Sequence, residues 1–289
     1  MDSTDLAYFT AVVEEGSVTA AARRLNCVQS NVTARIRSLE KGLGVSLFNR
    51  NGRGVVPTRA AETLLPHARQ VAASLAAARS SLEKLLNPDN PSGAISIGSM
   101  ETTAAVRLPP VLAAYHRSFP DVTISLRTGG TKMLIRELLA YQMDAALVAG
   151  PIDHPDLVAA DIGQERMVVV TAAGKGWTPG ADPVTALCFR ASCAYRERLE
   201  ALLAGLGHSR PRLLEFGTLE GIIGGVAAGI GLSLLPLAAV ERSPLAGALA
   251  THAVPPPWDV APTQLIYRRD AVMTAALARF IDHTRLGWA

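Results

Sequence analysis

The chain has 289 residues, three of them cysteines, and 49% of its residues are hydrophobic. That length suggests about two domains, and the apolar fraction is large enough to fill a sizeable core. Three cysteines argue against a disulfide-bonded scaffold and favour a protein of the reducing cytoplasm.

No export signal or membrane segment is evident. The N-terminus, MDSTDLAYFT, has neither the basic start nor the apolar core of a secretory signal. The most apolar later stretch, IIGGVAAGIGLSLLPLAAV, contains several glycines and Pro236, which favour buried α/β elements over a membrane-spanning helix. We therefore expect a cytoplasmic protein with no membrane partner.

The net charge of +3 is distributed unevenly. Residues 17–59 hold eight basic residues and one acidic residue, whereas residues 91–289 hold 17 of each. This asymmetry predicts a polyanionic partner for the N-terminal segment alone. The alternative is a solvated helical face without such a partner.

The spacing of apolar residues predicts three helices at the start of the chain. The first is capped by Ser3 or Thr4 and ends at Gly16, and Ser17 caps the second. A short turn around Asn26–Cys27 leads to the third helix. The apolar positions expected to face inward are Leu6, Phe9, Val12, Val13, Ala21, Ala22, Leu25, Val32, Ile36 and Leu39.

The polar residues of the second and third helices are typical of a helix-turn-helix that binds double-stranded DNA. A recognition helix places its N-terminal side chains at base edges in the major groove, where Gln and Asn suit adenine and Arg suits guanine. The preceding helix crosses the phosphate backbone, which suits arginine. The residues expected to contact DNA are Arg23, Arg24, Gln29, Ser30, Asn31, Thr33, Arg35 and Arg37.

The segment LFNRNGRGVVPT (residues 47–58) predicts a hairpin between two short apolar strands, because its NG and RG pairs are typical of turns. Such a hairpin forms the wing of a winged helix-turn-helix. We expect Arg50 and Arg53 on this wing to bind phosphate or the minor groove.

The stretch from Ser17 to Arg50 resembles the LysR-type transcriptional regulators. The matching segments are SVTAAARRL, QSNVTARIRSLE and LGVSLFNR, followed by Thr58, which opens the next helix. Two positions depart from the family pattern. Val28 stands where a Ser or Thr cap is common, so the cap is expected at Asn26 or Cys27. Arg59-Ala60-Ala61 stands where family members often have glycine.

Residues 58–86 are expected to form one long helix, about 43 Å long at about 1.5 Å per residue, with a kink at Pro66. Its apolar residues are spaced as in a coiled coil, which predicts a homodimer. The alternative is a helix packed on its own domain. The resemblance to the LysR-type regulators implies that this helix forms the dimer interface. The seam residues are Leu64, Ala68, Val71, Leu75, Ala78, Leu82 and Leu85.

From residue 91 onward, strands alternate with helices, which predicts an α/β fold with mostly parallel sheets. The expected strands are AISIGS, VTISLRT, DAALVAG, ERMVVVTA, ALCFR, LLEFG and GLSLLP. The resemblance implies a two-lobed effector-binding domain similar to the periplasmic solute-binding proteins. Its hinge crossovers are expected near Asp161–Gln164 and Tyr267–Arg269.

The domain organisation follows from these elements. The segments are a winged helix-turn-helix at 1–57, a dimerisation linker at 58–90 and an effector-binding domain at 91–289, with the turn-rich sequence NPDNPSG (residues 87–93) at the second boundary. Lobe I takes residues 91–163 and 269–289, and lobe II takes residues 164–268.

Small hydroxyl and thiol side chains follow four of the expected strands. Ligands of open α/β sheets bind beyond the carboxyl ends of the strands, where helix N-termini attract anions. We therefore expect one cleft that binds a small anionic effector, with Glu101 facing solvent or, alternatively, pairing with an amine of the ligand. The candidate effector-binding residues are Ser99, Thr102, Thr103, Thr128, Thr131, Ser192, Cys193 and Thr218.

Other motifs do not indicate enzymatic chemistry. The segment GGVAAGIG (residues 224–231) resembles a nucleotide-binding loop, but it follows a helix and precedes a strand, which is the wrong order. The histidines lack metal-ligand spacing, and no catalytic triad or carboxylate pair is recognisable. We expect no metal, no cofactor and no catalytic residue. Cys193 at a helix N-terminus, with Cys188 nearby, leaves a redox sensor as an alternative.

The sequence therefore predicts a ligand-responsive, sequence-specific transcription regulator that acts as a homodimer or a dimer of dimers. Two other classes stay open as alternatives. One is an enzyme acting on a small anion in the α/β lobes, and the other is a free-standing solute carrier, which the missing signal peptide disfavours.

Overall fold

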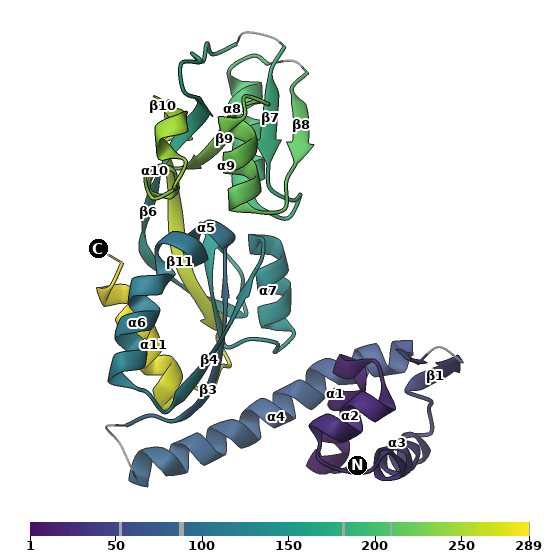
Figure 1. The fold of residues 1–289 in the computed structure, drawn as a ribbon. Coiled ribbons are helices and arrows are strands. Elements are labelled where there is room, and N and C mark those ends of the chain that lie inside the picture. The colour runs from purple at the N-terminus through teal and green to yellow at the C-terminus, as the bar shows by residue number, and fades with distance from the viewer. Residues whose placement is uncertain (52–53, 87–89, 181–182, 209, 289) are drawn as a thin grey trace. The chain divides into compact units, whose positions relative to one another are not determined.

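The computed structural model describes residues 1–51, 54–86, 90–180, 183–208 and 210–288 (Figure 1). The chain divides into two compact units, Met1–Glu83 and Lys84–Ala289. Among the described residues, no helix is both long and apolar enough to cross a membrane.

The N-terminal unit begins with three helices, α1 (Ser3–Glu15), α2 (Val18–Arg24) and α3 (Gln29–Leu43). They are followed by the hairpin of β1 (Phe48–Asn51) and β2 (Gly54–Pro57), which is the expected wing. The apolar faces of the three helices meet in one core. Its most buried members include Phe9, Val12, Ala21, Val32 and Leu39.

The helix starts differ in part from the prediction. Asp2, and not Ser3 or Thr4, caps α1, because Asp2 and Asp5 each accept the other's backbone N–H in a capping box. Ser17 caps α2 as predicted. The N-cap of α3 is Val28, and it makes no side-chain cap, so neither Asn26 nor Cys27 caps this helix.

The linker helix α4 (Arg59–Leu86) divides its apolar seam between two environments. Leu64 and Ala68 pack into the core of the N-terminal unit. Farther along, Val71, Leu75 and Leu82 are 38%, 47% and 62% exposed. The first part of the seam is therefore covered by its own domain, and the second part is uncovered in a single chain.

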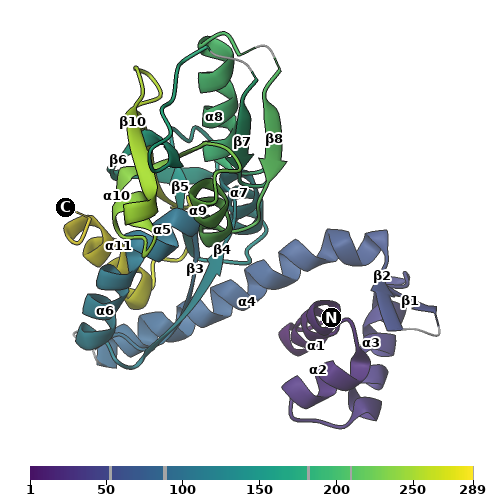
Figure 2. The same cartoon turned by 45° about the horizontal axis from the view of Figure 1, so that its top comes forward.

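Lobe I of the second unit is a sheet with helices on both faces (Figures 1 and 2). The strands β3 (Gly93–Ser99), β4 (Val122–Thr128) and β5 (Ala145–Ala149) are parallel neighbours, in the order β5-β3-β4. The helices α5 (Glu101–Val106), α6 (Leu108–Ser118) and α11 (Ala275–Leu286) lie along one side, and α7 (Thr131–Leu139) covers the other. Alternate residues of β5 enter the two cores: Ala145 and Leu147 enter one, Ala146 and Val148 the other.

Lobe II contains β7 (Thr185–Cys188), α8 (Ala194–Gly205), β8 (Arg212–Glu215), α9 (Leu219–Ala227), β9 (Ser233–Pro236), α10 (Leu237–Glu241) and β10 (Leu249–Ala253). A 3-10 turn at Ala246–Ala248 precedes β10. The pair β7–β8 is parallel, and Ala186 bridges to Leu232 beside β9. The glycine-rich segment 224–231 runs from the end of α9 toward β9, which is the order expected for a packing segment.

Two long strands pass from one lobe into the other (Figure 1). They are β6 (Leu157–Ala172) and β11 (Val260–Arg268), and they pair antiparallel with each other. From Met167 onward, β6 exchanges this partner for β9 and β10 of lobe II. The first crossover was expected near Asp161–Gln164, and there the pairing shifts register by one residue opposite Thr263/Gln264.

The expected second crossover near Tyr267–Arg269 differs from the observed strand pairing. Residues 263–267 of β11 pair with β5, so they already belong to lobe I, and the chain leaves lobe II near Val260. The antiparallel partners β6, β9, β10 and β11 also make the sheets mixed, whereas mostly parallel sheets were expected. The partners of β11 in β5 lie more than a hundred positions away in the sequence, which local periodicity does not reveal.

Candidate functional site

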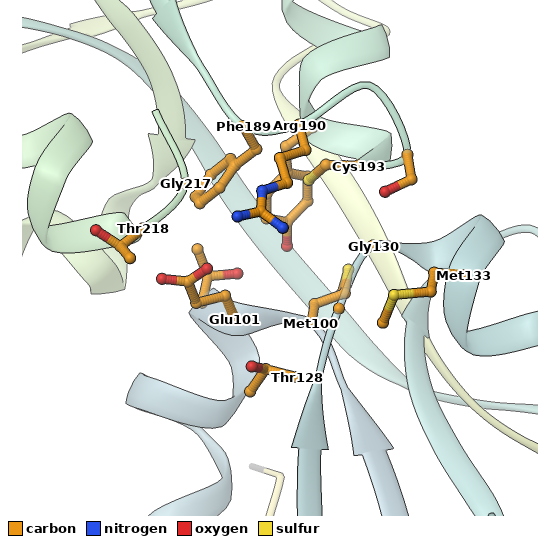
Figure 3. Close-up of a pocket in the computed structure, with 14 residues that line it drawn as sticks. Met100, Glu101, Thr128, Gly130, Met133, Phe189, Arg190, Cys193, Gly217 and Thr218 are labelled. Carbon is orange, nitrogen blue, oxygen red and sulfur yellow. The ribbon is translucent and has the colours of Figure 1, made fainter. Parts of the chain in front are cut away.

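Four helix N-termini surround one cavity between the lobes (Figure 3). The N-cap residues of α5, α7, α8 and α9 are Met100, Gly130, Cys193 and Thr218, and all four line the cavity. Each of these helices follows the carboxyl end of a strand, β3, β4, β7 or β8. The cavity has a volume of about 420 Å³, which is sufficient for a small metabolite.

The structure brings five of the eight predicted effector-binding residues to this cavity and leaves three outside its lining. Thr102, Thr128, Ser192, Cys193 and Thr218 line it. Ser99 is fully buried and donates to the Met100 carbonyl at 3.0 Å. The Thr131 hydroxyl accepts the Ala149 N–H at 3.3 Å, and Thr103 is buried. Ser99, Thr103 and Thr131 therefore support the cavity wall from behind.

Arg190 is a lining residue that the sequence did not single out. It follows β7, and Figure 3 shows its guanidinium pointing into the cavity. Within the described residues, no hydrogen bond or ion pair of its side chain is present, in contrast to Arg196, which pairs with Glu200 and Glu215. An exposed guanidinium in a cleft is suited to bind a carboxylate or another planar anion.

Two buried hydroxyls, one from each lobe, lie at the same cavity. Thr102 is 4% exposed and Tyr195 is 2% exposed. Neither hydroxyl makes a hydrogen bond of good geometry to a described residue. Burial, followed by the negative charge of Glu165, raises the pKa of Tyr195, whereas the adjacent Thr102 hydroxyl lowers it, so the two hydroxyls interact only weakly with each other. Because unpaired buried hydroxyls cost free energy, this pair is prepared for a polar ligand atom or a water.

Glu101 is half-buried and is bound within the protein, whereas the sequence analysis expected it to face solvent or to pair with a ligand amine. Its Oε1 accepts the Leu219 N–H at 2.7 Å, and so a carboxylate of lobe I reaches the N-terminus of α9 in lobe II. Burial raises the pKa of the Glu101 carboxyl, and the hydrogen bond from Leu219 opposes that rise. Glu220 raises this pKa further, whereas Arg190 lowers it.

The lobes also approach each other closely at Gly130 and Ser192. A Cβ atom at Gly130 would lie 2.4 Å from the Ser192 carbonyl oxygen, which is closer than atoms can approach. Nearby, Lys132 and Glu197 form an exposed ion pair across the cleft. Glycine at position 130 is therefore what allows the two backbones to meet.

The two cysteines of lobe II do not have the environment of a redox sensor. Cys188 is buried in β7, and its thiol donates to the Leu214 carbonyl. Burial raises the pKa of both thiols, and at Cys193 this outweighs the backbone hydrogen bonds of the helix N-terminus. The helix N-terminus therefore does not lower the pKa of Cys193, because desolvation exceeds the effect of the helix, and this disfavours the redox alternative.

The predicted DNA-binding residues share an exposed surface only in part. Gln29, Ser30, Asn31 and Arg37 are exposed on α3, and Thr33 is half-buried. Arg23 is exposed on α2. The Arg53 prediction lies outside the described residues, as does the side chain of Arg50.

Two of the predicted phosphate contacts are paired within the protein. Arg24 donates to Glu14 at 2.8 Å and to Glu15 at 3.3 Å. Arg35 donates to Asp5 at 2.9 Å. The positive charge available on this surface is therefore smaller than the residue count indicates.

Among the described residues there is also no cluster of three or more His, Cys, Asp or Glu that could hold a metal.

Adding one methyl group at the cleft mouth is expected to separate the lobes. Gly130→Ala would place its Cβ against the Ser192 backbone, whereas Gly129→Ala, the matched control, would meet only the flexible end of the Met133 side chain. Amide hydrogen exchange at residues 190–195 should be faster in Gly130→Ala and unchanged in Gly129→Ala. Equal exchange in the two variants would show that the lobes do not meet at Gly130.

Comparison with known proteins matches both units to one family. Residues 3–62 match the bacterial regulatory helix-turn-helix protein, lysR family, and residues 88–288 match the LysR substrate binding domain. The chain is 40% identical to YusT, an uncharacterized HTH-type transcriptional regulator of Bacillus subtilis, over 98% of this chain and 95% of YusT. It is 38% identical to the HTH-type transcriptional regulator GltR of Bacillus subtilis, over 97% and 95%.

Solved structures show the same fold over the full length. Full-length OxyR from Pseudomonas aeruginosa is similar with a TM-score of 0.77 and 22% identity, covering 99% of this chain and 95% of that one. CbnR bound to its target DNA is similar with a TM-score of 0.69 and 25% identity, covering 99% and 100%. The chain therefore belongs to the LysR family of DNA-binding transcription regulators that carry an effector-binding domain.

Proposed function

We propose that this regulator changes its promoter binding in response to a small anionic metabolite held between the lobes. The observation that carries this proposal is the cavity into which four helix N-caps and the Arg190 guanidinium converge. Helix N-termini carry a partial positive charge and free N–H groups, so each of them favours an anion.

The residues divide into two groups by the part of the ligand that they suit. Arg190, Ser192 and the N-termini of α8 and α9 suit the acidic group. The unpaired hydroxyls of Thr102 and Tyr195 suit a second polar atom deeper in the cleft. Met100, Met133 and Phe189 provide apolar contacts around the ligand body.

We propose that α3 contacts bases through Gln29, Ser30, Asn31 and Thr33. The first three are exposed at the helix N-terminus, where recognition helices meet base edges. Arg23 and Arg37 suit phosphates because both are exposed. Arg24 and Arg35 would have to exchange their carboxylate partners for phosphate, so they contribute less.

We propose that the exposed part of the α4 seam forms a homodimer with a second copy of the chain. Val71 and Leu75 also line an apolar groove between α1 and α4 of about 490 Å³. Exposed leucines and valines beside an open groove are typical of an interface. A pair of such dimers stays a prediction.

The base contact is tested at Gln29. Gln29→Ala should weaken operator binding by about 1–3 kcal/mol and relax the preference at one base pair, because a bidentate base contact is lost. Ser38→Ala, which is also exposed on α3 but away from its N-terminus, serves as the control. Fluorescence anisotropy with operator DNA and single-base variants measures both effects, and an unchanged base preference in Gln29→Ala would contradict the assignment.

The dimer is tested in a variant with both Leu75→Asp and Leu82→Asp. These residues are exposed in the single chain, so the charges should leave the fold intact but disrupt an apolar interface. Sedimentation should show monomers, while far-UV circular dichroism stays unchanged. Gln70→Asp, an exposed α4 residue off the seam, should remain dimeric. A dimer in the double variant would place the interface elsewhere.

The effector site is tested at Arg190. Thermal-shift screening of the full chain against metabolites should yield small carboxylates or similar anions. Arg190→Met should then weaken binding by about 1.5–3 kcal/mol, or roughly ten- to a hundredfold, because a charge-assisted hydrogen bond is lost. Arg212→Met, on the exposed part of β8, is the control. Calorimetry that gives equal affinities for both variants would remove Arg190 from the site.

A further inference from the structure

Glu101 holds a position at α9 that a bound anion would otherwise occupy. Leu219 is the first residue of α9, and its N–H is one of the donors that a helix leaves unpaired at its N-terminus. Thr218 accepts the Gly221 N–H at 3.0 Å, and Glu101 accepts the Leu219 N–H at 2.7 Å. A carboxylate of the protein itself is thus bound to a helix N-terminus of the opposite lobe.

The helix that carries Glu101 is attached to lobe II at both ends. Arg242, directly after α10, donates to the Val106 carbonyl at the end of α5. The next residue, Arg107, forms a two-point ion pair with Glu165 of β6, at 2.8 and 3.1 Å. One end of α5 is held in this way, and the Glu101 contact attaches its other end, at the cleft, to lobe II as well.

We propose that Glu101 is an internal carboxylate ligand of the cleft, which binds the N-terminus of α9 in the effector-free chain and keeps the two lobes together. The part of this inference in which an effector competes with Glu101 for the N-terminus of α9 rests on the anion site proposed above. An effector that places its acidic group at α9 has to displace Glu101.

The charges around Glu101 make that exchange feasible. Arg190 faces it from the segment after β7, Glu220 from α9 and Cys193 from the start of α8. Burial and Glu220 raise the pKa of the Glu101 carboxyl, so the hydrogen bond from Leu219 and the charge of Arg190 do not fully offset the cost of burying the ionised group. Its release into water would recover part of that cost, while the incoming anion pairs with Arg190.

The test is hydrogen exchange at the Leu219 amide in the full chain, measured by mass spectrometry without any effector. Glu101→Ala should exchange about tenfold faster at this amide, because its only cross-lobe acceptor is removed. Glu101→Gln should retain the protection, since an amide oxygen still accepts the bond. Glu220→Gln, which changes a neighbouring charge on α9, should behave as the parent.

Peptides from α11 provide the internal reference for an intact fold and should stay protected in every variant. Unchanged Leu219 exchange in Glu101→Ala would overturn the proposal. Equal loss of protection in Glu101→Gln and Glu101→Ala would also overturn it, because the effect would then come from local disruption and not from a lost acceptor.

Acetate tests whether the vacated position binds a free carboxylate. Acetate should restore Leu219 protection in Glu101→Ala and leave the parent unchanged, whereas chloride at the same ionic strength should do neither. Failure of acetate to restore protection would overturn the competition between Glu101 and an anion. None of these measurements uses an effector, so their failure leaves the Arg190 assignment intact, and failure at Arg190 leaves the Glu101 contact intact.

Discussion

The antiparallel pairing of β6 with β11 is the constraint on which the effector-binding unit depends. Both strands extend from one lobe into the other. The lobes are therefore connected by two hydrogen-bonded strands and not by loops alone. The register shift at Thr263/Gln264 leaves one unpaired residue in β6, and a β-bulge is a place where a sheet bends. Gly163 lies beside it, with the Trp288 ring so close that no side chain would fit there.

With the lobes held in this way, four strands of two different sheets direct their carboxyl ends at one space. The helices that follow them contribute N-termini, and their partial charges favour an anion more strongly together than any one of them would alone. The protein places one cation, Arg190, and one carboxylate, Glu101, on opposite sides of this space. Part of the cleft is therefore satisfied by the protein's own carboxylate, and a ligand that displaces Glu101 gains only the difference between its contacts and those that it replaces.

The N-terminal unit follows the same principle of internal pairing. Residues 17–59 of this unit hold eight basic residues and one acidic residue, yet Arg24 and Arg35 pair with acidic side chains of α1. Exposed pairs of this kind are worth little for stability, but they orient the second and third helices relative to the first. Counting arginines therefore overestimates the charge that is offered to a phosphate backbone, and the exposed polar residues at the start of α3 are the more informative signal.

The sequence by itself determined the winged helix-turn-helix, the long linker helix and the strand-helix alternation, because these depend on local periodicity, caps and turns. It also located Thr102, Thr128, Ser192, Cys193 and Thr218 at the cleft, since strand ends next to helix starts are visible in the chain. Only the tertiary structure decided the positions of Arg190 and Tyr195 at the cavity, the contact of Glu101 with α9, and the pairing of β11 with β5. Each of these joins residues far apart in sequence, and whether a charged or hydroxyl group is buried, paired or free depends on neighbours that no local pattern specifies.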